Sequence, residues 1–274
     1  MKKLMFAAVA LTAGFAMAET VESDQIVGYV QAGKAEASQY VPLATQFEAL
    51  GGGDIAVKNA VTVENAVASN TAAGDQLWRW DTATATWTKY AYYKKPRTDP
   101  AEIFWTKIVN DKAEGTETTD TIPAGETFFF KRSSGATEAA TLTLAGGVKD
   151  LSGESSFAVT QNQLAFVANP WPTEIVIKDF NQFVTEGTPS ASNTAAGDQI
   201  WLWDTANGTW VKYCLHKDSR AGITDNWRKI VGTKPDTKET EDTIPAGKGI
   251  FFQRSGLASP TEPLKVTFTL PITK

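Results

Sequence analysis

One segment of the chain occurs twice, and this duplication constrains the fold more than any other feature. Residues 68–90, ASNTAAGDQLWRWDTATATWTKY, recur as 191–213, ASNTAAGDQIWLWDTANGTWVKY, with 18 of 23 positions identical. The correspondence continues from Trp105 to Trp227 and through the hexapeptide DTIPAG. The copies are offset by 122 or 123 residues, a typical domain size, whereas open solenoids usually need at least three repeats. We therefore expect two tandem homologous domains.

The first 18 residues have the three regions of a secretory signal peptide. Two lysines open the segment, an apolar run follows at 4–15, and Ala16-Met17-Ala18 fits a cleavage site. No later stretch has the ~20 apolar residues that a membrane-spanning helix needs. We expect export of a mature chain that begins at Glu19, to the periplasm, the cell surface or the medium.

The two copies meet near Gly146-Gly147, just before a turn-rich stretch. The expected parts are therefore a signal peptide at 1–18, a first β repeat at 19–147 and a second β repeat at 148–274.

Short segments rich in β-formers, separated by Gly, Pro, Asn and Asp, predict an all-β fold. The clearest is a hairpin in the second copy, where two such segments flank Asn207-Gly208, the dipeptide of a type I′ turn. A two-residue turn at this dipeptide pairs Leu202 with Tyr213. Many short strands of this kind are typical of β-sandwiches or small barrels, so we expect one or the other in each repeat.

The two faces of this hairpin differ in character. Strand alternation places three tryptophans on one face and the following residues on the other: Ile200, Leu202, Val211, Tyr213 and Leu215. In this copy the aliphatic face resembles a core. In the first copy the same face carries Arg79 and Thr88, which favours tryptophans inside. The sequence thus leaves open whether the tryptophans are packing residues or an exposed surface.

Exposed tryptophans would be platforms for sugar rings, with lysines nearby to hydrogen-bond hydroxyl groups. Two loops that differ between the copies, 92–100 and 216–222, add aromatic and cationic side chains suited to an anionic sugar. The candidate ligand-binding residues are Trp78, Trp80, Trp87, Lys89, Trp201, Trp203, Trp210, Lys212, Tyr93, Lys94, His216 and Arg220.

Catalytic and metal chemistry have few candidates in this chain. A single histidine and a single cysteine exclude zinc-finger, iron–sulfur and disulfide frameworks. Cys214 and His216 lie two residues apart on one strand, so they aim in parallel, and no third group orients them. The carboxylate pairs available for glycoside hydrolysis are Asp75 with Asp81 and Asp198 with Asp204. These carboxylates have the sequence context of turn residues, so we expect no enzyme activity, no cofactor and no metal site.

The repeated pattern GDQ(L/I)WxWD…W.KY…W.KIV…DTIPAG..FF.R resembles that of uncharacterised secreted, repeat-containing β proteins, which some bacteria encode in many copies. The resemblance covers most of both copies. It implies export and a β fold, and it implies no activity and no catalytic or binding residue.

These observations predict an exported, non-catalytic protein that binds or adheres outside the cell, with polysaccharide or envelope glycan as the favoured partner. With 26 basic against 31 acidic side chains, the chain has no basic surface for nucleic acid. The alternative is a structural or self-assembling surface protein, in which tryptophan faces or strand edges pack against other subunits. A secreted hydrolase comes third.

Overall fold

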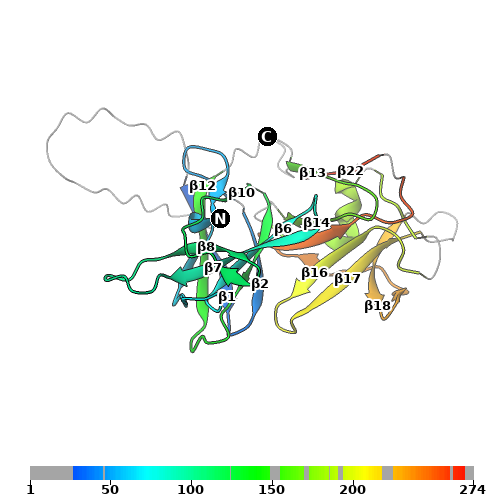
Figure 1. Cartoon of the computed structure of the whole chain (residues 1–274). Coiled ribbons are helices and arrows are strands. Elements are labelled where there is room, and N and C mark those ends of the chain that lie inside the picture. Colours follow the sequence, from blue (N-terminus) through cyan, green and yellow to red (C-terminus); the bar gives the residue numbers. More distant parts are fainter. Residues whose placement is uncertain are drawn as a thin grey trace, which may run out of the picture.

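The computed structural model describes residues 27–45, 47–123, 125–148, 155–169, 173–184, 186–190, 194–217, 225–259 and 262–268. Strands dominate these residues and form several sheets, and in this part of the chain no sheet closes into a barrel (Figure 1). The all-β prediction is confirmed. The predicted signal peptide at 1–18 lies outside the described residues. We refer to residues 27–148 as the first half and to residues 155–268 as the second half.

Each half contains a six-stranded antiparallel sheet, and the two sheets have the same strand order. In the first half the order is β2 (Tyr40–Ala44), β11 (Thr127–Lys131), β6 (Gln76–Asp81), β7 (Thr86–Lys94), β8 (Ile103–Val109) and β9 (Lys112–Ala113). In the second half it is β14 (Leu164–Ala168), β21 (Gly249–Gln253), β16 (Gln199–Asp204), β17 (Thr209–His216), β18 (Asn226–Val231) and β19 (Lys234–Pro235). The duplicated sequence therefore forms the same sheet twice.

Smaller elements cover one face of each six-stranded sheet. In the first half β1 (Val27–Ala35) pairs with β12 (Ala140–Val148), which also pairs with β3 (Phe47–Glu48) and β5 (Thr62–Glu64). In the second half β13 (Ser155–Val159) pairs with β22 (Leu264–Phe268). Two short ladders and two 3₁₀ helices are the remaining elements among the described residues: β4 (Ile55–Ala56) with β10 (Thr121–Ile122), β15 (Ile175–Val176) with β20 (Thr243–Ile244), η1 (Val57–Asn59) and η2 (Ile177–Phe183).

The glycine pair near the predicted boundary lies inside strand β12. Gly146 pairs with Gly28 of β1, and a Cβ atom there would lie 2.5 Å from the carbonyl oxygen of Glu48. Glycine is therefore required because β3, which pairs with β12 at the next two residues, brings the Glu48 backbone close to this position. The turn-rich stretch that follows, at 149–154, lies outside the described residues.

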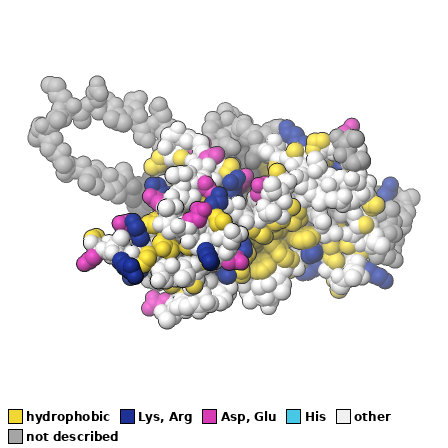
Figure 2. Space-filling model, in the orientation of Figure 1, with side chains coloured by type: hydrophobic (Ala, Val, Ile, Leu, Met, Phe, Trp, Pro, Cys, Tyr) yellow, Lys and Arg dark blue, Asp and Glu magenta, His cyan; other side chains and the backbone are white. Residues whose placement is uncertain are grey.

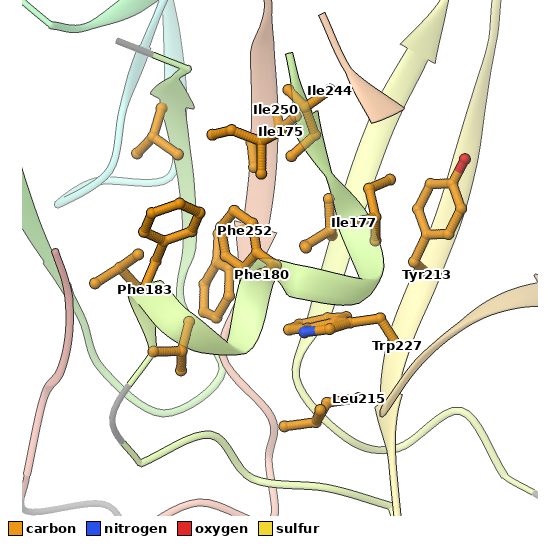
Figure 3. Close-up of a cluster of buried hydrophobic side chains, with 14 of the residues drawn as sticks. Ile175, Ile177, Phe180, Phe183, Tyr213, Leu215, Trp227, Ile244, Ile250 and Phe252 are labelled. Carbon is orange, nitrogen blue, oxygen red and sulfur yellow. The ribbon is translucent and has the colours of Figure 1, made fainter. Parts of the chain in front are cut away.

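The main core of each half lies between its six-stranded sheet and the smaller sheet. Leu77 and Tyr90 in the first half, and Ile200 and Tyr213 in the second, are at most 1% exposed. They lie on the aliphatic face that strand alternation indicated in the second copy. In the second half η2 packs its aromatic side chains onto this core, as Figure 3 shows.

The hairpin register differs from the prediction by two residues. Asp204 pairs with Thr209, and Leu202 pairs with Val211 rather than with Tyr213. The connecting loop has four residues because the Asp204 carboxylate accepts hydrogen bonds from the backbone N–H groups of the second and third loop residues, at 3.0 and 3.1 Å. Gly208 closes the loop at φ +63°. A shift of two residues preserves the faces, so the predicted alternation is correct although the predicted partners are wrong.

Candidate functional site

The tryptophan faces of the two six-stranded sheets meet where the two halves adjoin. Phe129 and Phe251 are 4% and 3% exposed at the centre of this aromatic cluster, and the hairpin tryptophans around them are half-buried. The cluster comprises Tyr40, Trp78, Trp80, Trp87 and Phe129 from the first half and Leu164, Phe166, Trp201, Trp203, Trp210 and Phe251 from the second. Both faces of each hairpin are thus packed, one against the core of its own half and the other against its duplicate.

The contacts between the two halves are reciprocal, as they are between the subunits of a symmetric dimer: each half makes to the other the same contact that it receives. The indole N–H of Trp80 donates to the carbonyl oxygen of Leu164 at 2.7 Å. Its counterpart Trp203 donates to the carbonyl oxygen of Tyr40 at 2.8 Å. Because Tyr40 and Leu164 occupy the same position in β2 and β14, these two bonds are equivalent. They fix the orientation of both indole rings across the junction.

The ring contacts at the centre repeat the same symmetry. Phe129 makes edge contacts with Trp203 and Trp210, at centroid distances of 5.5 and 5.8 Å. Phe251 makes the matching contacts with Trp80 and Trp87, at 5.5 and 6.0 Å. Aromatic pairs in such geometry stabilise a structure by roughly 0.5–1.5 kcal/mol each beyond their buried area. The cluster is therefore a structural interface as well as a candidate binding surface.

One tryptophan of each half carries a lysine over its ring. The Nζ atom of Lys89 lies 4.2 Å from the ring centroid of Trp78, and that of Lys212 lies 3.5 Å from the centroid of Trp201. Lys131 adds a second ammonium group 5.3 Å from the Trp78 ring. Among the described residues no carboxylate forms an ion pair with these three lysines. The aromatic surface is thus bordered by uncompensated positive charge.

A groove of about 260 Å³ remains between the rings of the cluster. Its lining residues are Tyr40, Trp78, Trp80, Trp87, Phe129, Leu164, Trp203, Trp210 and Phe251. Figure 2 shows hydrophobic side chains gathered on the surface where the two halves meet. Ligand pockets for drug-sized molecules measure roughly 300–1,000 Å³, so the groove has room for a small ring or one unit of a longer chain.

The structure brings together only part of the predicted site. Five of its six tryptophans line the groove, whereas Trp201 lies beside it. Tyr93 is buried against Phe104 near the far end of β7, about 20 Å along the strand from Trp87 at the usual rise per residue. Lys94 is exposed at that same end. The 92–100 loop and the tryptophan face are therefore separate surfaces.

The corresponding end of the second half is also distant from the groove. His216 is buried, and its backbone forms a bridge with Ser190 at the end of β17. Arg220 lies outside the described residues. Cys214 is buried, and burial raises the pKa of its thiol to about 11. This thiol is protonated at neutral pH and is not an activated nucleophile.

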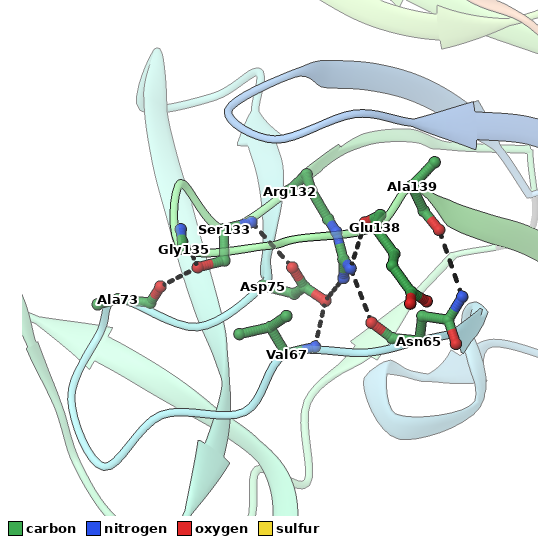
Figure 4. Close-up of polar contacts among 9 residues, drawn as sticks. All are labelled: Asn65, Val67, Ala73, Asp75, Arg132, Ser133, Gly135, Glu138 and Ala139. Atoms are coloured by element: carbon green, nitrogen blue, oxygen red, sulfur yellow. Dashed lines mark hydrogen bonds and ion pairs between the residues drawn. The ribbon is translucent and has the colours of Figure 1, made fainter.

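The candidate carboxylates belong to buried ion pairs and to turns. Asp75 is fully buried and accepts hydrogen bonds from Arg132 at 2.6 Å and from the backbone N–H groups of Val67 and Ser133 at 2.8 Å (Figure 4). Asp81 lies at the other end of β6, about 20 Å away, where it accepts hydrogen bonds within the hairpin loop. Paired glycosidase carboxylates lie about 5–9.5 Å apart, so these two cannot act together.

The second copy repeats this arrangement. Asp198 accepts a hydrogen bond from Arg254 at 2.6 Å, and Asp204 caps its own loop. Burial raises the pKa of Asp198, against the opposing effect of hydrogen bonds from Ser255, Thr188 and Arg254. The buried arginine partners were not anticipated from the sequence, although each aspartate and each arginine recurs in both copies.

A second carboxylate that recurs in both copies accepts hydrogen bonds from a core tyrosine and from a lysine. Asp120 accepts hydrogen bonds from the Tyr90 hydroxyl at 2.8 Å and from Lys107 at 3.1 Å. Burial by itself raises the pKa of Asp120, but these two donors lower it below the usual value. Asp242 has the equivalent partners in the second half, and its pKa is lowered for the same reason.

Sequence reasoning missed the part of the groove that comes from outside the hairpins. Tyr40, Phe129, Leu164 and Phe251 lie on β2, β11, β14 and β21. The duplicated Phe-Phe pairs were a usable signal, because alternation on a strand sends one phenylalanine of each pair to the core and the other to the opposite face. Phe130 and Phe252 are indeed the core members.

Within the described residues no three His, Cys, Asp or Glu side chains are close enough to hold a metal ion. The same residues contain no helix long and apolar enough to cross a membrane. Comparisons with protein-family models, curated proteins and solved structures gave no match.

Proposed function

We propose that the chain is an exported, non-catalytic protein that binds polysaccharide through the aromatic groove between its two halves. The observation that carries the proposal is the groove itself, in which rings from both halves surround a space of about 260 Å³. The apolar face of a sugar ring stacks on indole and phenol rings, while its hydroxyl groups remain available for polar contacts. One sugar unit of a polymer matches the size and the lining of the groove.

The fixed geometry of the rings supports binding of this kind. Trp80 and Trp203 are held by hydrogen bonds across the junction, and the indole N–H of Trp78 donates to Gln76 at 2.6 Å. Rings that are already oriented lose little conformational entropy when a ligand stacks on them. The lysines beside the groove favour sugars that carry negative charge, because they have no carboxylate partner among the described residues.

A depletion assay with a matched pair of variants tests this proposal. Purified mature chain 19–274 is mixed with insoluble polysaccharides and peptidoglycan, and the protein left in solution is measured. Trp78 lines the groove, whereas Trp201, its equivalent, does not, although both donate to a glutamine and lie under a lysine. Trp78→Leu and Trp201→Leu therefore make the same chemical change inside and outside the groove.

We expect at least one polysaccharide to retain the wild-type protein. Loss of one stacked ring, at roughly 0.5–1.5 kcal/mol, weakens binding by about two- to tenfold. Trp78→Leu should show this loss and Trp201→Leu should not. Equal retention of both variants, or no retention of the wild-type protein by any polysaccharide, would contradict the proposal.

One observation favours the alternative of a self-assembling surface protein. β1 lies at the edge of its sheet, and among the described residues no strand pairs with its outer side. Tyr29 on this strand is 82% exposed. Unprotected edge strands can pair with another chain. Light scattering at rising protein concentration tests this alternative. The alternative requires that the protein associates as its concentration rises and that Tyr29→Lys weakens this association.

A further inference from the structure

A second cavity lies at the junction between the two halves, next to the aromatic groove. It measures about 320 Å³, and Trp80 lines both spaces. Its other walls include Thr82 and Glu126 from the first half and Ser156, Phe157 and Phe268 from the second. The two cavities are therefore neighbours that share one indole ring.

The chemical character of this cavity differs from that of the groove. Glu126 forms a two-point ion pair with Arg79, at 2.8 Å from Nε and 3.2 Å from Nη2. Both side chains are about one-third exposed. A carboxylate offers about four acceptor positions, of which Arg79 occupies two. The remaining positions can accept hydrogen bonds from hydroxyl groups, and the ion pair leaves no net charge to repel a neutral or acidic sugar.

Both halves hold Glu126 in place. Its carbonyl oxygen accepts hydrogen bonds from the N–H and the hydroxyl of Thr45, at 2.9 and 2.8 Å. Its backbone also forms a β-bridge with Val167 of the second half. The carboxylate is thus positioned before any ligand arrives, as an effective binding group must be.

The duplication shows that this ion pair is specific to one half. The positions equivalent to Arg79 and Glu126 are occupied by Leu202 and Lys248. Lys248 instead points toward the carbonyl oxygen of Ala32, with Nζ at 3.4 Å. The junction is symmetric in its tryptophans and asymmetric in this pair, so a ligand that occupies both cavities would bind in a single direction.

We propose that the cavity at Glu126 is a second subsite for the same glycan, adjacent to the aromatic groove. The ligand is then an oligosaccharide of at least two units. One unit stacks in the aromatic groove, the chain passes Trp80, and the next unit donates hydrogen bonds from its hydroxyl groups to Glu126. This inference rests on the proposed function and adds chain length and direction to it.

Calorimetric titration with a length series tests the inference. The probes are chito-oligosaccharides, cello-oligosaccharides and acidic oligogalacturonates of one to six units, titrated into wild-type protein, Glu126→Gln, Trp78→Leu and Lys248→Gln. Lys248→Gln is the matched control at the equivalent position of the other half. Ser156→Tyr, which adds a bulky ring to the wall that the second half contributes to the cavity, is the second variant. Circular dichroism checks the fold of each protein.

We expect wild-type affinity to rise about tenfold or more between one unit and longer chains. Glu126→Gln and Ser156→Tyr should abolish this rise and leave the affinity for a single unit unchanged, while Lys248→Gln should behave as wild type. If oligosaccharides bind and Trp78→Leu weakens them but neither cavity variant changes the length dependence, the second subsite is refuted and the groove stands. If no saccharide of the three series, neutral or acidic, binds, both proposals fail.

Discussion

The close approach of Thr127 and Gly249 gives a direct test of how the two halves dock. These residues occupy equivalent positions at the start of β11 and β21, yet they face each other across the junction. A Cβ atom added to Gly249 would overlap Cγ2 of Thr127 and would lie 2.7 Å from its Oγ1 and 2.8 Å from its Cβ. Non-bonded carbon atoms are normally about 3.5–4.0 Å apart. Rotation of the Thr127 side chain cannot relieve the contact with its Cβ, so the two strands must separate by about 1 Å.

Gly249→Ala should therefore destabilise the protein by about 1–3 kcal/mol, the usual cost of an overpacked core. The backbone of Gly249 does not have a positive φ, so the loss would come from packing rather than from backbone strain. Thr127→Gly should cost about 1 kcal/mol by itself, because glycine weakens a strand. In the double variant the added methyl group enters the space that Thr127 vacates. The coupling energy between the two changes should then be about 1–3 kcal/mol in the stabilising direction.

Equilibrium unfolding in urea measures these free energies, and each kcal/mol also shifts Tm by about 2–4 °C for a chain of this size. Gly135→Ala is the control, because the nearest atom to its added Cβ is 3.7 Å away, and it should change stability by less than about 0.5 kcal/mol. Additive effects of Gly249→Ala and Thr127→Gly would refute the docking of the two halves described above.

Three further predictions concern the duplicated local structures. Ala85 has φ +53° at the loop position where the second copy has Gly208. Ala85→Gly should therefore stabilise the protein by about 0.5 kcal/mol, and Gly208→Ala should destabilise it by about 1 kcal/mol. Thermal melts in which both variants shift Tm in the same direction would be inconsistent with this geometry. Arg132→Met leaves the buried Asp75 carboxylate without its cation. The free energy of unfolding in urea should then fall by about 3–5 kcal/mol, and a fall of less than about 1 kcal/mol would show that the pair is not buried. The pKa of Asp120 is lower in the folded chain than in the unfolded one, so its contribution to stability is present above about pH 4 and is lost as pH falls through the folded pKa. The stability difference between wild type and Asp120→Asn should therefore shrink in unfolding experiments below about pH 4, and a difference that grows there would contradict the assignment.

The alternation of side chains on strands made much of the fold predictable. It placed Leu202 and Tyr213 on the core face although the predicted pairing between the strands was wrong. The face of a residue depends only on whether its position along the strand is odd or even, whereas the pairing depends on the length of the loop. The loop length was set by Asp204, whose carboxylate holds a four-residue turn. The Asn-Gly dipeptide alone does not reveal this competing interaction.

The 3₁₀ helix η2 was missed because it is too short for a helical period of 3.6 residues to emerge. Its buried residues Ile177, Phe180 and Phe183 recur every third position, which is the period of a 3₁₀ helix. The spacing of three residues is therefore the sequence signal of this segment.

The candidate site could be predicted only in part because its other wall is distant in the sequence. The tryptophans were identified from the hairpins, but what covers them depends on how one copy meets the other. Trp80 reaches Leu164 and Trp203 reaches Tyr40, contacts that span 84 and 163 residues. Neither local pattern nor composition specifies such contacts, although the identity of the two copies makes a reciprocal arrangement a natural one.

The central claim is that a glycan binds among the groove tryptophans, and their indole N–H signals in a nuclear magnetic resonance titration report this most directly. The chain has nine tryptophans, and single Trp→Phe variants assign their signals. On addition of an oligosaccharide cut from the retaining polysaccharide, the signals of Trp78, Trp87 and Trp210 should shift together. Those of Trp105 and Trp227, which are buried in the two cores, should remain in place. Shifts confined to tryptophans outside the groove, or binding that moves none of the groove signals, would contradict the account.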